Sequence, residues 1–132
     1  MKTLLTFLLI VMTAFCSMAA EPPTIVEIDK DGVQRVEMLG SEYFFKPGHI
    51  VVKINVPVEI KVRKDALIVP HDFVISAPEA GISINESLSR DPKTFFFTPG
   101  KVGKYPIYCS KKVPFMKSHR EKGMEALLEV VE

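Results

Sequence analysis

Cysteine is scarce in this sequence, which has only Cys16 and Cys109 among its 132 residues. Cys16 lies in an N-terminal apolar segment that we expect to be removed, so Cys109 is the one thiol of the remaining chain. A single thiol excludes an internal disulfide. In a protein sent to an oxidising compartment, such a cysteine is a metal ligand, a reactive group, an intermolecular link or a buried bystander. The cysteine count leaves these four interpretations open.

An excess of charge of either sign is also missing. The chain has 17 basic and 16 acidic residues, and one of the basic residues, Lys2, belongs to the N-terminal segment. The remaining domain is therefore formally neutral. Neutrality gives no general indication of a nucleic-acid partner or of an anionic membrane surface, so any electrostatic attraction must come from a local cluster of charges.

A long hydrophobic run is absent as well, because the apolar stretch at residues 4–12 is too short to be a good membrane span. It follows Lys2 and precedes small residues at positions 17–20, which is the layout of a secretory signal peptide. We expect residues 1–20 to be a signal peptide and residues 21–132 to form a single exported domain, located in the periplasm without stable membrane insertion. An uncleaved N-terminal anchor is the alternative.

The rest of the chain has no internal repeat, and its prolines and glycines separate short apolar segments. Alternating apolar residues predict strands at residues 24–28, 33–39, 50–56, 60–62, 71–75, 94–98, 104–109 and 125–132. Residues 76–91 are predicted to be a loop. Seven or eight short strands with almost no helix predict an all-β sandwich or a small barrel.

A capping-box pattern precedes the last predicted strand. Ser118 is followed three residues later by Glu121, and Gly123 comes soon afterwards. A serine or threonine followed at this spacing by glutamate is typical of a helix N-terminus, and glycine is typical of its end. The pattern predicts a single short helical turn.

Four residues of ligand type occur in a suggestive order. Cys109, His119 and Met124 follow one another across a loop between two predicted strands, and His71 begins an earlier strand. A type 1 copper site needs two imidazoles and a thiolate in a trigonal arrangement, with a weak thioether at the axial position. The alternatives are a buried cysteine, a structural His71, a surface His119 and a Met124 that belongs to the core.

At these residues the sequence resembles the cupredoxins. The resemblance is carried by the segments Phe44-Phe45-Lys46-Pro47-Gly48, Val69-Pro70-His71-Asp72-Phe73-Val74-Ile75, Pro99-Gly100, Tyr105-Pro106-Ile107-Tyr108-Cys109, and His119 through Met124. It implies a Greek-key β-sandwich that holds one copper ion, with His71, Cys109, His119 and Met124 as the ligands.

Two departures from the family pattern concern the loop from Cys109 to Met124, the ligand loop, which carries three of the four implied ligands. Nine residues separate Cys109 from His119, more than in small blue copper proteins. The position of the second cysteine of the binuclear domain of oxidase subunit II is occupied by Val113, so a mononuclear site is predicted. The long loop leaves Met116 as an alternative axial ligand to Met124. It also leaves room for a looser, more open site.

The resemblance implies a one-electron carrier that is not an enzyme. The alternatives are a periplasmic copper storage or delivery protein and a copper enzyme or sensor with an open coordination position. A β-sandwich without metal would make the order of the ligand residues a coincidence. We expect a redox partner protein, such as a cytochrome or a terminal reductase or oxidase, whose acidic surface would face the basic residues of the ligand loop. These are Lys111, Lys112, Lys117, Arg120 and Lys122.

Overall fold

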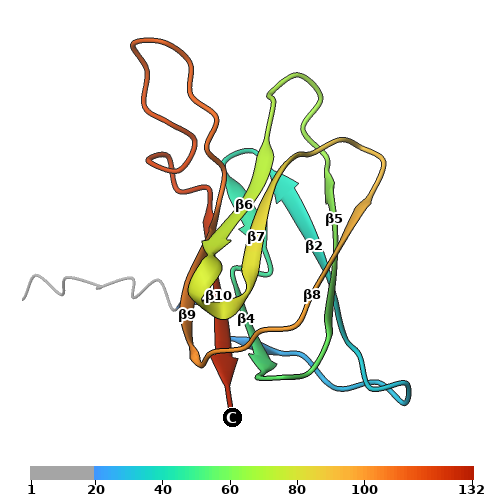
Figure 1. Ribbon diagram of the computed structural model, residues 1–132. Coiled ribbons are helices and arrows are strands. Elements are labelled where there is room, and N and C mark those ends of the chain that lie inside the picture. The colour runs from blue at the N-terminus through green and yellow to red at the C-terminus, as the bar shows by residue number, and fades with distance from the viewer. Residues whose placement is uncertain (1–19) are drawn as a thin grey trace, which may run out of the picture.

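The computed structural model describes residues 20–132, and the expected signal peptide lies almost entirely outside this range. Two β-sheets pack face to face as a sandwich (Figure 1), which confirms the predicted all-β class. No helix within the described range is long and apolar enough to cross a membrane. The ten strands are β1 (Thr24–Ile25), β2 (Gln34–Ser41), β3 (Phe44–Lys46), β4 (His49–Lys53), β5 (Val58–Lys64), β6 (Asp72–Ala77), β7 (Ile82–Ser87), β8 (Lys93–Phe97), β9 (Gly103–Tyr108) and β10 (Glu125–Val131).

Strands distant in sequence are neighbours in both sheets. The larger sheet has the order β1-β4-β10-β9-β6-β7, and the smaller has the order β3-β2-β5-β8. In the larger sheet β10 runs parallel to β4 and antiparallel to β9, and β6 is antiparallel to both β9 and β7. The central position of β9 and β10 matters for function, because these strands border the ligand loop.

Alternating apolar residues form the core between the sheets. Ile50 and Val52 of β4 face inward, as do Ile60 and Val62 of β5, and each is at most 1% exposed. Leu128 of β10 is also completely buried. These residues have the period of two expected for strands with one face on a core, so the sequence pattern located the core correctly.

Two predictions about strand positions were wrong. Residues 76–91 were predicted to be a loop, but they contain a short 3-10 helix, η1 (Pro78–Ala80), and the edge strand β7. In β7 the apolar alternation stops after Ile82 and Ile84 because the remaining residues are polar, so the pattern is too short to predict a strand. The strand predicted at residues 50–56 ends at Lys53, because Asn55 turns the chain with a φ of 59°.

The β5–β6 and β9–β10 connections lie at the same end of the sandwich, where the second of them projects beyond the sheets (Figure 1). The turn predicted in this connection is present as a hydrogen-bonded turn over residues 119–123, but it does not form a helix. The Ser118 hydroxyl accepts a hydrogen bond from the Glu121 amide at 3.1 Å, and Glu121 accepts one from the Ser118 amide at 2.7 Å. Gly123, with a φ of 103°, ends the turn just before β10.

Candidate metal centre

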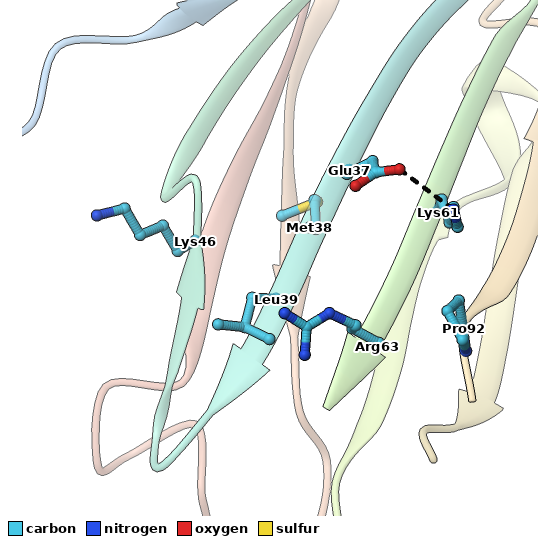
Figure 2. Close-up of a pocket in the computed structure, with 7 residues that line it drawn as sticks. All are labelled: Glu37, Met38, Leu39, Lys46, Lys61, Arg63 and Pro92. Atoms are coloured by element: carbon cyan, nitrogen blue, oxygen red, sulfur yellow. Dashed lines mark hydrogen bonds and ion pairs between the residues drawn. The ribbon is translucent and has the colours of Figure 1, made fainter. Parts of the chain in front are cut away.

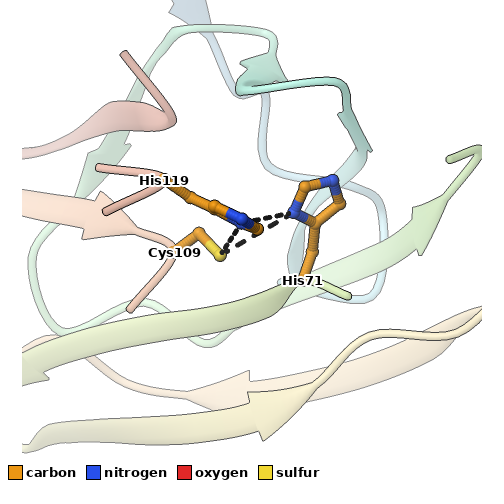
Figure 3. Close-up of side chains that lie close together, drawn as sticks. All are labelled: His71, Cys109 and His119. Carbon is orange, nitrogen blue, oxygen red and sulfur yellow. Dashed lines mark hydrogen bonds between the residues drawn. The ribbon is translucent and has the colours of Figure 1, made fainter. Parts of the chain in front are cut away.

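Three side chains from separate segments meet at this end of the sandwich. His71 lies directly before β6, Cys109 directly follows β9, and His119 lies in the β9–β10 connection. The pairing of Val74 with Tyr108 joins β6 to β9 and so brings the first two residues together. Figure 3 shows both imidazoles directed at the sulfur. The Nδ1 atoms are 3.2 Å apart, and Sγ is 3.5 Å from Nδ1 of His119 and 3.8 Å from Nδ1 of His71.

The cluster is closed to solvent. His71, Cys109 and His119 are 1%, 0% and 2% exposed. Nε2 of His71 is buried and has no hydrogen-bond partner among the described residues. A buried ring nitrogen without a partner costs free energy, and an interaction at the other nitrogen of the ring does not relieve that cost. The support for a metal at this site therefore comes from the convergence of Sγ and the two Nδ1 atoms.

The separations of the three ligand atoms fit a trigonal metal site. Bonds of about 2.0 to 2.3 Å from a transition metal to nitrogen and sulfur place three such ligands roughly 3.5 to 4.0 Å from one another. The observed separations of 3.2, 3.5 and 3.8 Å are close to this range. One thiolate and two imidazoles form the equatorial donor set of a type 1 copper site, so the residues present fit the ion that the family resemblance implies.

Burial sets the protonation of the three groups. It lowers the pKa of His71 to about 4, with a further contribution from the charge of a protonated His119. It also lowers the pKa of His119, where the positive charge of Lys122 acts in the same direction. Both imidazoles are thus neutral at pH 7, as a metal ligand must be. Burial raises the pKa of the Cys109 thiol, so binding a metal must release its proton.

Backbone and side-chain hydrogen bonds hold the thiol in place. The amide of Asp72 donates to Sγ of Cys109 at 3.5 Å. The buried carboxylate of Asp72 accepts hydrogen bonds from both the amide and the hydroxyl of Ser110, the residue after the cysteine. These contacts tie the start of β6 to the end of β9. Such outer contacts orient metal ligands and tune them.

The carboxylates near the motif in sequence have other partners. The carboxylate of Asp72 accepts hydrogen bonds from Ser110, that of Glu121 accepts one from the Ser118 amide, and that of Glu125 pairs with Arg120 at 2.6 Å. Among the described residues the one group of metal-binding side chains contains no carboxylate. The structure therefore gives no support to a carboxylate ligand in this cluster.

The two candidate axial ligands have different environments. Met124 is completely buried, whereas Met116 is 52% exposed. The Met124 amide donates to the carbonyl of His119 at 3.0 Å, and its carbonyl accepts a hydrogen bond from the Cys109 amide at 3.2 Å. These contacts favour Met124 over Met116, but its role as a ligand stays a prediction.

A hollow elsewhere on the surface is separate from this cluster. It has a volume of about 260 Å³ and lies against β2 and β5 of the smaller sheet (Figure 2). Its charged residues include Glu37 and Lys61, which form an ion pair at 3.2 Å. It shares no residue with the His71, Cys109 and His119 cluster.

Sequence analysis did not identify two residues that contact the cluster. The rings of Tyr43 and His119 are in an edge-to-face arrangement, and Lys122 lies over the Tyr43 ring. No sequence pattern marked Tyr43, because the pairing of β2 with β3 that places it in a two-residue turn is known only from the fold. Lys122 had been noted only for its charge.

Comparison with known proteins gives likenesses in structure alone. No family model and no curated protein sequence matches the chain. The metal-binding domain of the Cu(I)-exporting P-type ATPase CopA from Streptococcus pneumoniae has a TM-score of 0.64 and 21% identity, over 86% of this chain and 99% of that one. Reduced auracyanin from Roseiflexus castenholzii has a TM-score of 0.60 and 13% identity, over 74% and 97%. The periplasmic domain of cytochrome oxidase subunit II from Bradyrhizobium japonicum has a TM-score of 0.55 and 17% identity, over 80% of this chain and 88% of that one.

Proposed function

We propose that this chain, which has the cupredoxin fold, binds one copper ion through His71, Cys109 and His119 and carries single electrons. The observation that supports this most directly is the convergence of one sulfur and two Nδ1 atoms, from three separate segments, inside a buried cluster. Copper bound there would supply a one-electron redox couple. The thiolate provides a strongly covalent ligand, and the neutral imidazoles suit both oxidation states.

The protein's part in electron transfer is to keep the ligands from moving. Cys109 and His71 are attached to β9 and β6, which are neighbours in the larger sheet. The hydrogen bonds between Asp72 and Ser110 fix the two strand ends relative to each other. Ligands in nearly constant positions reduce the rearrangement that accompanies a change of oxidation state. Met124 is the proposed axial ligand, since it is buried and bonded through its backbone to both Cys109 and His119.

The proposed partner is a redox protein with an acidic surface, such as a cytochrome or a terminal reductase or oxidase. Lys111, Lys112 and Lys117 form no ion pair among the described residues. The last two are exposed, on the connection that projects beyond the sandwich. Arg120 pairs with Glu125, so it is less available. The proposed location is the periplasm, which the sequence of residues 1–20 supports.

Copper delivery is the second candidate function. It is favoured by the likeness to the metal-binding domain of a Cu(I) exporter and by the exposure of the connection that carries His119. Val113, Phe115 and Met116 in this connection are 49%, 107% and 52% exposed. A loosely packed ligand loop makes metal release easier. The burial of all three cluster residues speaks against an open-site copper enzyme or sensor.

The proposed site is tested by adding one equivalent of Cu(II) to the mature protein and recording visible and electron paramagnetic resonance spectra. An intense thiolate-to-copper band that is lost in Cys109→Ala is expected. Equal spectra for the two proteins would remove Cys109 from the metal and overturn the proposal. A thiolate band with wide hyperfine splitting would keep the ligand but indicate a tetragonal site.

The two candidate functions are separated by two rates. An electron carrier is expected to exchange electrons rapidly with a soluble redox protein while losing Cu(I) slowly to a chelator such as bathocuproine disulfonate. A delivery protein is expected to lose Cu(I) rapidly to the chelator and to exchange electrons slowly. Rapid loss of Cu(I) with slow electron exchange would therefore contradict the carrier and favour delivery.

A further inference from the structure

A tyrosine occupies a turn position whose backbone conformation disfavours it. Tyr43 lies in the two-residue turn between β2 and β3, which is closed by the pairing of Ser41 with Phe44. Its φ is 60°. Residues other than glycine, asparagine and aspartate lose about 1 kcal/mol or more in this left-handed region. A tyrosine at such a position points to a role of its side chain that offsets the strain.

The side chain of Tyr43 lies against both imidazoles of the cluster. Its ring meets the ring of His119 at a centroid distance of 5.1 Å and an interplanar angle of 76°. It meets the ring of His71 at 6.4 Å and 83°. Both are edge-to-face contacts, a favourable arrangement for aromatic rings. Tyr43 is itself only half-buried, whereas the two histidines that it contacts are almost completely covered.

Lys122 holds this ring from the ligand loop. Its Nζ lies 4.4 Å from the Tyr43 ring centroid and 3.4 Å from the phenolic oxygen. A lysine ammonium over an aromatic face is attracted by the ring. The Lys122 amide donates to the His119 carbonyl at 3.2 Å. The same short turn therefore carries both His119 of the cluster and Lys122, the residue that contacts Tyr43.

We propose that Tyr43, held by Lys122, is the cap of the metal pocket and prevents water and small anions from reaching the bound ion. This inference rests on the proposed copper site and names the residue that keeps it closed. A trigonal ion with a weak axial ligand has coordination space that an external ligand would otherwise take. Tyr43 is thus a positioning residue that makes the site selective for electron transfer over direct reaction with small molecules.

Azide binding to the Cu(II)-loaded protein tests the cap. The variant is Tyr43→Asn, because asparagine tolerates the left-handed turn while removing the ring. Azide is expected to change the visible and electron paramagnetic resonance spectra of this variant at a concentration at least tenfold lower than for the wild-type protein. Tyr43→Phe keeps the ring and should behave like the wild type. Phe44→Ala, which alters the next residue of the same hairpin, is the matched control.

A second measurement needs no metal. Cys109 is completely buried, so its alkylation by neutral iodoacetamide in the metal-free protein reports access to the pocket. Tyr43→Asn is expected to raise the alkylation rate at least tenfold, whereas Tyr43→Phe and Phe44→Ala leave it unchanged. Circular dichroism verifies that each variant is folded. If Tyr43→Asn does not fold, Lys122→Met takes its place, and loss of the lysine contact should raise the same rate.

The outcomes separate this inference from the proposed function. A copper–thiolate band in the wild type, with azide response and alkylation rate unchanged in Tyr43→Asn, would overturn the cap and leave the copper site standing. No such band in the wild type would overturn the copper site. In that case the alkylation rates alone decide whether Tyr43 covers the pocket, and equal rates would overturn the cap as well.

Discussion

Burial of the histidines should make the stability of the metal-free protein depend on pH. The pKa of His71 is about 4 in the folded chain, compared with an ordinary value of 6.5. Between these values the unfolded chain binds a proton that the folded chain does not, so stability is lost as the pH falls through this window. Above pH 6.5 the contribution is constant.

Urea unfolding of the metal-free protein between pH 7 and pH 4 is therefore expected to show a falling free energy of unfolding. His71→Gln removes this titrating group and should weaken the pH dependence over that range. Carboxylates titrate in both proteins and cancel in the comparison. If the free energy of unfolding fell equally steeply with pH in the two proteins, His71 would be protonated as readily in the folded chain as in the unfolded one.

The axial position should respond to Met124 and not to Met116. A thioether favours Cu(I), whereas the amide oxygen of glutamine favours Cu(II), so Met124→Gln should lower the reduction potential. A tenfold change in relative affinity corresponds to about 59 mV for one electron, and a decrease of this order or more is expected. Cyclic voltammetry measures it. Met116→Gln, at an exposed position, is the control, and a larger shift in that variant would reverse the assignment.

Among the elements, the turn that begins at Ser118 contains His119 and is expected to position it. Loss of the hydrogen bond that the Ser118 hydroxyl accepts from the Glu121 amide should cost about 1 kcal/mol of stability, as for other N-terminal caps. Ser118→Ala is accordingly expected to release copper several times faster, as measured by transfer to a chelator. Ser89→Ala also loses a hydroxyl bond to the backbone, at Asp91, and should release copper at the wild-type rate. Similar rates in the two variants would mean that the turn does not hold His119.

The elements also differ in how well the sequence predicted them. Strands with a clear apolar alternation were found within a few residues, as for β9, where Tyr105 and Ile107 are buried. Strand β7 was missed because its apolar alternation stops after Ile82 and Ile84 and its other residues are polar. Its pairing with β6 comes from backbone hydrogen bonds at the edge of a sheet, which leave little trace in the order of side chains.

For the whole molecule, docking of a redox partner should depend only on the end of the sandwich that carries the β9–β10 connection. The domain is formally neutral after removal of Lys2, yet the β9–β10 connection, which carries the exposed Lys112 and Lys117, projects beyond the sheets. If an acidic partner docks there, the rate of electron exchange should fall with ionic strength, and the double variant Lys112→Glu, Lys117→Glu should slow it at least tenfold at low salt. Lys101→Glu is the control, since this residue precedes β9 and Cys109 follows it. A rate indifferent to salt and to the double variant would exclude electrostatic docking by this loop.

The sequence by itself determined the class of the fold and the three converging residues. Alternation predicted a sandwich because one face of each strand must be buried, and the order of His71, Cys109 and His119 indicated a metal cluster. Only the tertiary structure decided how closed that cluster is. Tyr43 is 28 residues from His71 and 76 from His119 in sequence, and its contact with both depends on which strands are neighbours. Periodicity reports the faces of single strands, whereas the cover of a pocket is formed by segments that meet only when the sheets assemble.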